Sequence, residues 1–355
     1  MHQKITSTLS KYEKIILVGW GTGGHIQPII SLVHSLDIGT DRYIWIGWVG
    51  STEEQAAKKE NIEFQSIPTL KLATTRSCQS LLYPFFLIRG FWKARNILRN
   101  IQHSNSPTLQ QSTCLFSKWW PGSVAIGLSA WSLQIPVHIH ESDTIPGRSN
   151  RILGKIATRI FLGFESARIY FDPKKCEVIG QILDPVFDLQ HSNIPTFQHS
   201  ISWKTTKPHI LVICGSQWSR TIFEKIITEF SWKSKYEWII ALGKLNSGMK
   251  GEFEKIPDCQ AIEWISQSDI AALILSTDLA ITRWSATTLA ELTNFQDSEF
   301  TINNLQLIIV PLPYSAGNHQ YHNALEYEKM GHVILEQKDL GKLTQTIQHN
   351  VWHNQ

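Results

Sequence analysis

The chain of 355 residues carries few charges of either sign. Charged side chains make up 18% of it, and 33 Lys and Arg against 30 Asp and Glu leave a formal net charge of +3. This excess is too small to indicate a nucleic acid partner, although local basic clusters still favour an anionic membrane surface or an anionic substrate. The length exceeds what one hydrophobic core usually serves, so we expect two domains.

Cysteine and long apolar runs are also scarce. The five cysteines form no C-x-x-C pair and stand at Cys78, Cys114, Cys176, Cys214 and Cys259. They predict free thiols in a reducing cytoplasm. No apolar run approaches the roughly 18 residues of a membrane-spanning helix, and residues 1–14 lack the apolar core of a signal peptide. These absences predict a cytosolic or peripheral protein.

A glycine-rich stretch near the N-terminus organises the rest of the chain. The apolar residues 15–18 predict a buried strand, and residues 26–36 predict a helix with Pro28 in its first turn. The residues between them, Gly19-Trp20-Gly21-Thr22-Gly23-Gly24-His25, then form a strand-to-helix loop. Its backbone N–H groups suit a phosphate or pyrophosphate, although glycines also serve plain tight turns. His25 either faces the same ligand or caps the helix.

Strand and helix patterns alternate along the rest of the chain. Strands are predicted at residues 43–47, 64–68, 137–140, 160–163 and 176–180, and a second series at 209–214, 238–242, 261–265, 278–282 and 305–311. The polar, aperiodic residues 189–208 read as a linker. We therefore predict an α/β protein of two Rossmann-like, doubly wound parallel-sheet domains, 1–188 and 209–355, facing a cleft that holds one site.

Two further stretches carry chemistry. Polar residues 141–144 follow a strand, where parallel sheets bind ligands; His140 and Glu141 there either act on a substrate or merely shape the loop. An aromatic, apolar run at residues 81–91 is followed by basic residues, which predicts either an anionic membrane contact or a core helix with a basic edge. The apolar members are Leu81, Leu82, Phe85, Phe86, Ile88 and Phe91, and the cations are Arg89, Lys93, Arg95 and Arg99.

Five motifs in one order resemble those of the bacterial MurG glycosyltransferases, from about residue 15 to about residue 340. They are Gly21-Thr22-Gly23-Gly24-His25; His140-Glu141 with Ile145-Pro146-Gly147 and Asn150; Gly215-Ser216-Gln217; Arg283 with Ala286-Thr287-Thr288-Leu289-Ala290-Glu291; and Pro311-Leu312-Pro313-Tyr314 with His319-Gln320 and Asn323-Ala324. Together they are far more specific than any one motif.

The resemblance implies a GT-B fold and an inverting transfer in peptidoglycan synthesis. N-acetylglucosamine would move from UDP-N-acetylglucosamine to the C4 hydroxyl of undecaprenyl-pyrophosphoryl-N-acetylmuramyl pentapeptide. The enzyme would be a peripheral protein at the cytoplasmic face of the cell membrane. It further implies that the first domain handles the lipid acceptor and the second mostly the nucleotide sugar, and that residues 81–91 contact the membrane.

The resemblance also implies roles for single residues. Thr22, Gly23 and Gly24 would border the sugar and pyrophosphate, and Asp143 stands where the family usually has Asn. Ser216 would bond a phosphate oxygen, and phosphate would also be held by the loop Ala286, Thr287, Thr288, Leu289 and Ala290. Ile265 would touch the uracil, Glu291 would bind the ribose, and Gln320 would bind the sugar. His25 would be the general base, because a neutral imidazole suits proton removal near pH 7; Glu141 is the alternative. No D-x-D pair is present, so we expect transfer without a metal or other cofactor.

Departures from the family pattern favour a second class of function. Phe187 stands near a usual Arg, and the chain ends soon after Leu340, without the usual long C-terminal helical segment. These features would suit a non-catalytic, membrane-associated GT-B scaffold that binds cell-wall intermediates. A nucleotide-sugar epimerase is a third possibility, supported only thinly by Asp143.

Tryptophan is unusually abundant, with 14 residues against 15 Phe and 8 Tyr. Seven fall in expected loops, mostly where the family pattern has glycine or another small residue: Trp20, Trp48, Trp119, Trp120, Trp131, Trp218 and Trp284. A large indole would fill space that a phosphate needs, and many such turns require φ > 0. We hypothesise that the organism reads the UGA codon as glycine; a drifted paralogue with true Trp is the alternative. Trp45 and Trp238, in predicted strands, are expected to be real.

Peptide mass spectrometry of the protein from its native cells tests the recoding hypothesis. We expect glycine at positions 119, 120, 218 and 284, because a bare backbone opens the phosphate loops. Tryptophan at these positions would contradict recoding and favour the scaffold.

Overall fold

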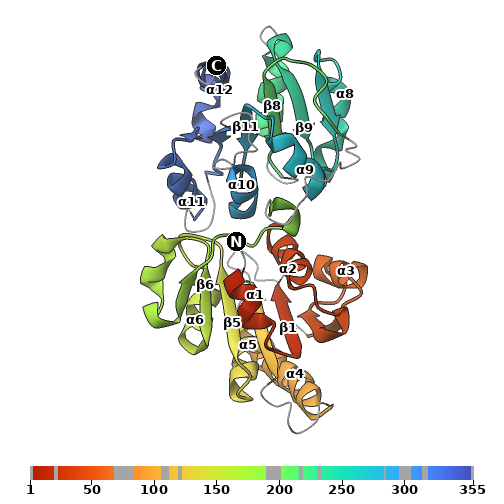
Figure 1. Cartoon of the computed structure of the whole chain (residues 1–355), viewed down its shortest axis with the longest axis vertical. Helices are drawn as coiled ribbons and strands as arrows, with labels where there is room; N and C mark the ends of the chain where they lie inside the picture. Colours follow the sequence, from red (N-terminus) through yellow and green to blue (C-terminus); the bar gives the residue numbers. More distant parts are fainter. Residues whose placement is uncertain are drawn as a thin grey trace. The chain divides into compact units, whose positions relative to one another are not determined.

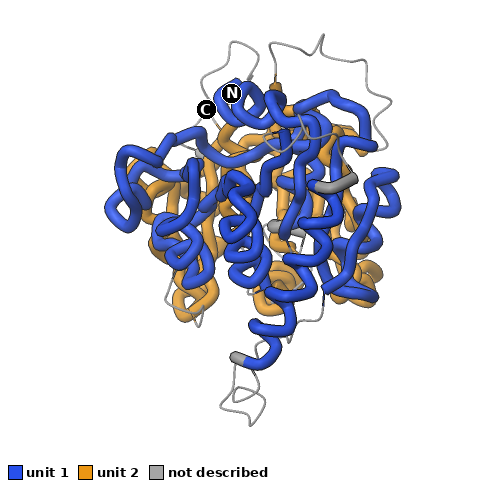
Figure 2. Tube along the Cα trace, turned by 90° about the horizontal axis from the view of Figure 1, so that it is seen from below, with its two compact units in different colours: residues 1–185 blue, residues 186–355 orange. Residues whose placement is uncertain are grey.

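The protein forms two compact units, Met1–Pro185 and Val186–Gln355 (Figure 2). The computed structural model describes residues 3–19, 23–67, 83–104, 112–118, 122–188, 201–215, 219–229, 233–283, 285–295, 305–313 and 319–352. Within these ranges the α/β class with two parallel sheets is confirmed.

The first unit is built on a seven-stranded parallel sheet in the order β3-β2-β1-β4-β5-β6-β7. Its strands are β1 Lys14–Gly19, β2 Tyr43–Gly47, β3 Glu63–Ser66, β4 Thr113–Lys118, β5 Val137–Glu141, β6 Arg159–Leu162 and β7 Cys176–Val178. Its helices are α1 Gln3–Leu9, α2 Gly23–Leu36, α3 Thr52–Lys59, α4 Tyr83–Ser104, α5 Ser123–Ser132 and α6 Arg148–Ile156.

Helices cover both faces of this sheet because alternate strand residues are apolar on both sides. Ile15 and Leu17 of β1 pack with α1, α2 and α3 on one face. Ile16 and Val18 pack with α4, α5 and α6 on the other. Strand β1 is therefore buried on both faces, as parallel central strands usually are (Figure 1).

The second unit holds a six-stranded parallel sheet in the order β10-β9-β8-β11-β12-β13. Its strands are β8 His209–Ile213, β9 Glu237–Ala241, β10 Cys259–Ile262, β11 Leu279–Thr282, β12 Gln306–Ile309 and β13 Val333–Ile334. Its helices are α7 Arg220–Thr228, α8 Lys250–Phe253, α9 Gln267–Ile274, α10 Ala286–Thr293, α11 His319–Glu328 and α12 Leu343–Trp352.

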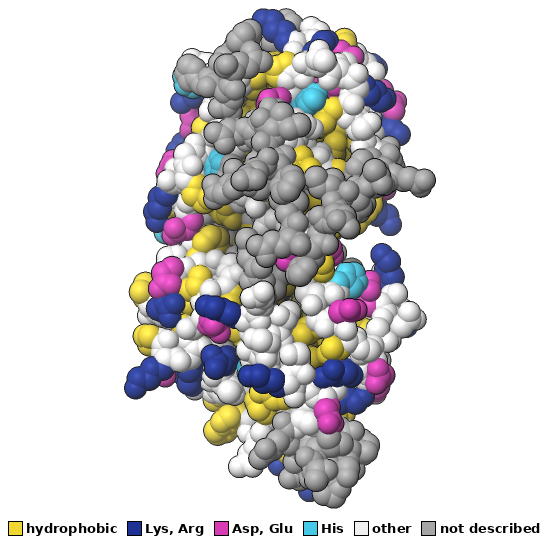
Figure 3. All heavy atoms as spheres, viewed as in Figure 1, with side chains coloured by type: hydrophobic (Ala, Val, Ile, Leu, Met, Phe, Trp, Pro, Cys, Tyr) yellow, Lys and Arg dark blue, Asp and Glu magenta, His cyan; other side chains and the backbone are white. Residues whose placement is uncertain are grey.

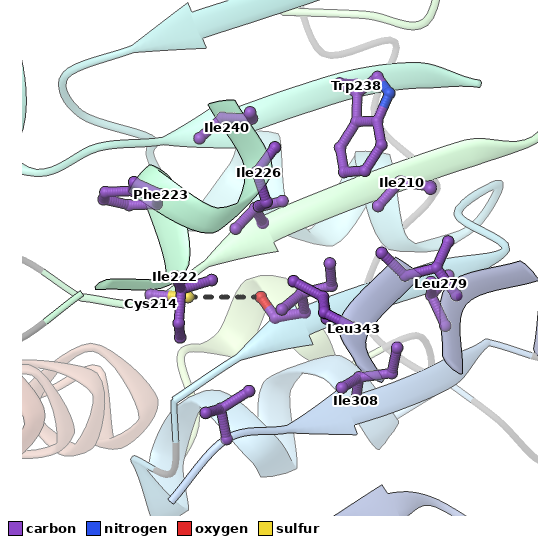
Figure 4. Close-up of a cluster of buried hydrophobic side chains, with 14 of the residues drawn as sticks. Ile210, Cys214, Ile222, Phe223, Ile226, Trp238, Ile240, Leu279, Ile308 and Leu343 are labelled. Carbon is purple, nitrogen blue, oxygen red and sulfur yellow. Dashed lines mark hydrogen bonds between the residues drawn. The ribbon is translucent and has the colours of Figure 1, made fainter. Parts of the chain in front are cut away.

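One face of this second sheet carries a continuous apolar core. Ile210, Ile240 and Ile308 from three strands meet Phe223 of α7 and Leu343 of α12 (Figure 4). At its margin the Cys214 thiol donates to the carbonyl of Ile281 at 3.7 Å. The four cysteines in the described ranges are free thiols, and Cys78 lies outside these ranges.

The two strand tryptophans fit the structure as tryptophan. Trp45 lies in β2 and Trp238 in β9, and both are fully buried. Removing a whole indole from such a site costs about 3–5 kcal/mol.

Several sequence expectations are wrong in detail. Helix α2 begins at Gly23, so Gly23, Gly24 and His25 form its first turn and Pro28 lies beyond it. Residues 286–290 belong to helix α10 and not to a loop, because Ser285 accepts a hydrogen bond from the N–H of Thr288 and caps that helix.

Three more expectations need correction. Trp131 lies inside helix α5 with its side chain 58% exposed, so a glycine-requiring turn does not explain it. The basic residues 150–160 predict a helix, but helix α6 ends at Ile156. Ile265 follows strand β10 instead of ending it.

An imidazole ties together three segments of the first unit. His34 of α2 contacts Glu60 through Nε2 at 3.0 Å and Asp184 through Nδ1 at 3.4 Å. The hydrogen bond to Asp184 is the main cause that raises the pKa of His34 from 6.5 to about 9, and Glu60 adds to it against partial burial. The charged imidazole therefore stabilises the fold.

We expect the His34→Gln variant to lose stability in a pH-dependent way. The stabilisation is fully present below the unfolded pKa of 6.5 and is lost as pH rises through about 9. Urea unfolding should separate variant and parent below the lower value and bring them together above the upper one. Because His34 is partly exposed, the difference is modest. An equal difference at both ends would contradict this assignment.

Candidate functional site

Each parallel sheet has one point at which the strand order reverses. In the first unit it lies between β1 and β4, and in the second between β8 and β11. In open parallel sheets, ligands bind beyond the carboxyl ends of the strands at this reversal. The predicted site residues should therefore lie at these two edges.

The glycine-rich stretch stands at the reversal of the first sheet. Gly19 ends β1 and pairs in register with Lys118, which ends β4. Gly23, Gly24 and His25 begin α2, so their backbone lies at a helix N-terminus beside this edge. Thr22 and Trp20 lie outside the described residues, as do the side chains of the first three residues of α2.

A buried lysine, unnoticed in the sequence, lies at the same edge. Lys118 is 1% exposed, and its Nζ donates to Ser142 Oγ at 2.7 Å and contacts His140 Nδ1 at 3.3 Å. His140 Nε2 lies 3.1 Å from the carbonyl oxygen of Gly180. Since a carbonyl only accepts, Nε2 carries the proton and Nδ1 is the acceptor facing Lys118. Burial lowers the pKa of Lys118 to about 7, against the opposing charges of Asp143 and Glu141.

Glu141 is the centre of the loop that follows β5. Its carboxylate accepts from the N–H of Asp143 at 2.9 Å, the N–H of Gly147 at 3.2 Å and Nδ2 of Asn150 at 2.9 Å. It is 2% exposed, and burial raises its pKa, with the charge of Asp143 adding to the effect. Because both oxygens are engaged, this geometry favours a loop-shaping role for Glu141 over proton removal.

Gln181 holds the same loop from the other side. Its Nε2 donates to the carbonyl of Ser142 at 2.8 Å. A Cβ on Gly163 would lie 2.2 Å from that nitrogen and 3.0 Å from the Ser142 carbonyl oxygen. Only glycine at 163 leaves room for this contact.

The residues predicted to bind the nucleotide sugar gather at the corresponding edge of the second sheet. Gly215, with φ of +71°, follows β8, and Ser216 lies outside the described residues. Arg283 follows β11 and is 5% exposed; its guanidinium donates to Gln337 Oε1 at 3.0 Å and Thr221 Oγ1 at 3.1 Å. Helix α10 begins three residues later, so its N-terminus also lies at this edge.

The side chains predicted to bind the nucleotide sugar are mostly buried. Ala286, Thr287, Leu289 and Glu291 of α10 are each at most 6% exposed, and Thr288 is half-buried. Gln320 of α11 is 6% exposed, and its Oε1 accepts from the N–H of Leu312, just after β12. Ile265, 8% exposed, lies between β10 and α9. The structure thus brings these residues to strand ends or helix starts of one sheet edge, except Glu291, which lies in the last turn of α10.

Two family models match this chain in succession. The glycosyltransferase family 28 N-terminal domain matches residues 15–162, and the glycosyltransferase family 28 C-terminal domain matches residues 209–355. The chain belongs to glycosyltransferase family 28. This confirms the glycosyltransferase class inferred from the motifs.

Curated relatives within this similarity carry one name. A UDP-N-acetylglucosamine–N-acetylmuramyl-(pentapeptide) pyrophosphoryl-undecaprenol N-acetylglucosamine transferase from Halothermothrix orenii is 28% identical over 340 residues, covering 91% of this chain and 85% of the relative. A protein of the same name from Coxiella burnetii strain RSA 331 is 28% identical, with 94% of this chain and 87% of the relative covered. The resemblance to the MurG group is confirmed.

Solved structures share the fold. MurG of Acinetobacter baumannii superposes with a TM-score of 0.69 at 20% identity, covering 94% of this chain and 90% of that one. A UDP-GlcNAc 2-epimerase from Neisseria meningitidis, bound to UDP-GlcNAc, gives 0.58 at 12% identity, covering 96% and 93%. At these identities, the similarity to the epimerase structure shows the shared fold alone and gives no support to an epimerase activity of this chain.

The family 28 chain exposes an apolar stripe on helix α4. Phe85, Ile88 and Trp92 are 59%, 59% and 58% exposed and recur at helical spacing, and Trp131 of the neighbouring α5 is 58% exposed. Of the other predicted contact residues, Phe86 and Phe91 are half-buried, and Leu81 and Leu82 lie outside the described residues. On the face shown in Figure 3, Lys and Arg side chains lie beside hydrophobic ones over the first unit, in the lower half of the view.

Among the residues that the structure describes, no helix combines the length and hydropathy needed to cross a membrane. No group of three or more His, Cys, Asp and Glu side chains in the same ranges is placed to hold a metal ion.

Substitution of Glu141 tests its loop-shaping role. We expect Glu141→Ala to lower the free energy of unfolding by about 1–3 kcal/mol, because three buried N–H donors lose their acceptor. Glu141→Gln keeps one acceptor oxygen and should lose less. Urea unfolding measures both, and equal losses in the two variants would argue against this network.

Proposed function

We propose that this chain transfers N-acetylglucosamine from UDP-N-acetylglucosamine to the C4 hydroxyl of undecaprenyl-pyrophosphoryl-N-acetylmuramyl pentapeptide, with inversion. The observation that carries the proposal is the shared name of relatives that match 91% and 94% of this chain. The two family 28 domains supply the fold that such a transfer uses.

In this proposal the second unit binds the donor. The N-terminus of α10 and the backbone after Gly215, with Ser216, hold the diphosphate, because oriented N–H groups stabilise negative charge on the leaving UDP. Ile265 contacts the uracil, Glu291 the ribose and Gln320 the sugar hydroxyls. No metal or other cofactor takes part.

The first unit provides the acceptor side. Thr22, Gly23 and Gly24 border the sugar and pyrophosphate, and Asp143 contacts substrate from the loop after β5. His25, in the first turn of α2, removes the proton from the attacking hydroxyl. The engagement of both Glu141 oxygens by N–H donors supports His25 as the base.

Release of UDP measures the proposed reaction. Purified protein with UDP-N-acetylglucosamine should release UDP when the lipid acceptor is added and little without it. Tight nucleotide-sugar binding with no release under any condition would instead favour the non-catalytic scaffold.

The general base is tested by His25→Ala. We expect turnover to fall by roughly 10²–10⁴-fold, the usual cost of losing a general base. His349→Ala, at an exposed histidine of α12 outside the predicted site residues, is a matched control and should keep the parent rate. An undiminished rate in His25→Ala would exclude the assignment.

We further propose that the exposed stripe on α4 contacts an anionic membrane surface as a peripheral attachment. Its apolar side chains would enter the interface, while Arg89, Lys93 and Arg99 would attract anionic headgroups. Such an attachment would hold the unit that handles the lipid acceptor at the cytoplasmic face of the cell membrane.

Vesicle binding tests the attachment. The double variant Phe85→Ser and Ile88→Ser should bind anionic vesicles roughly tenfold or more weakly, since each lost side chain withdraws apolar area from burial. Val49→Ser, at an equally exposed apolar site outside α4, is the control. Binding that is unchanged in the double variant, or equal on neutral vesicles, would contradict the proposal.

A further inference from the structure

Burial of the Lys118 side chain costs free energy, because its charged amino group loses contact with water. It ends β4, is 1% exposed and pairs in register with Gly19 at the reversal of the sheet. Lysine is almost never fully buried unless it is paired. Within the described residues, no carboxylate lies within ion-pair distance of its Nζ, so its attachment depends on neutral partners.

Those partners lie on the loop that follows β5. The ammonium donates to Ser142 Oγ at 2.7 Å and faces Nδ1 of His140 at 3.3 Å. Ser142 is also held at its carbonyl by Gln181. Its two sequence neighbours are Glu141, fixed by three N–H donors, and Asp143, which is half-buried and gives one of those donors. Lys118 thus fastens the middle residue of the segment that presents Asp143.

The second sheet has a cation in the matching place. Arg283 follows β11, the strand that lies beside β8 at the reversal, as β4 lies beside β1. Arg283 is likewise buried and also donates to neutral side chains, Gln337 and Thr221. In both sheets a buried basic residue therefore lies next to a strand that has a glycine at or just after its carboxyl end.

We propose that Lys118 is a positioning residue for the acceptor, which it serves by fastening Ser142 and so orienting Asp143; this inference rests on the proposed function. Lys118 acts through the loop and not on the reacting atoms. Its loss therefore affects the acceptor side of the reaction and leaves nucleotide-sugar binding, assigned to the other unit, intact.

Steady-state kinetics of Lys118→Met tests this role. The variant keeps the length of the side chain and removes the donor. We expect kcat/KM for the lipid acceptor to fall roughly 10- to 100-fold, as for a lost hydrogen bond from a charged group, with KM for UDP-N-acetylglucosamine unchanged. Lys14→Met, at the opposite end of the same sheet, is the control. Parent-like acceptor kinetics, or an equal rise in both KM values, would overturn the inference.

Two further measurements keep the test decisive. If Lys118→Met does not fold, Ser142→Ala removes only the Oγ acceptor and should show the same selective loss in milder form. If the parent protein releases no UDP when the acceptor is present, the proposed function fails. Amide hydrogen exchange then tests whether Lys118 still fastens the loop. Faster exchange of the Asp143 N–H in Lys118→Met supports the fastening, and unchanged exchange overturns it.

Discussion

The parallel direction of every strand pair is the constraint on which the rest of the structure depends. Parallel pairing sends all carboxyl ends of a sheet to one edge and forces each connection to cross a face as a helix. Helix N-termini and the turns that precede them therefore collect at the same edge. In both units this edge holds the residues that the family motifs single out.

Polar groups at these edges are organised by neutral partners and backbone N–H groups more than by ion pairs. Glu141 is held by three N–H donors, and Lys118 by a hydroxyl and an imidazole. A buried charge without its partners is costly, so such loops have one favourable arrangement. The loop after β5 is therefore shaped before any substrate arrives.

Sequence patterns predicted the buried strands well and the site geometry less well. Strands such as β1, β2 and β8 are runs of β-branched residues, and that composition alone identifies them. The pattern does not predict strand β4, although Thr113–Lys118 is buried throughout, because the polar Thr113, Ser117 and Lys118 leave only a short apolar run between them. The sequence pattern predicts a loop at the first turn of α2 because glycine is a poor helix former, a local preference that tertiary context overrides here.

The side-chain roles at the site depend on contacts that no sequence pattern encodes. That Glu141 shapes its loop follows from the positions of the N–H groups of Asp143 and Gly147, which only the folded loop defines. The cap at Ser285 did carry a signal, a serine just before a helix start, and it would have placed 286–290 in α10.

The order of strands in the first sheet also bears on how the chain reaches its fold. Central strand β1 pairs with β2, close in sequence, but also with β4, with Lys14 opposite Thr113. Closing so long a stretch of chain is entropically unfavourable before the contacts are made, which slows folding. The segment β1 to β3 can therefore assemble early, and the edge that holds Gly19 and Lys118 forms only when the later half of the unit docks.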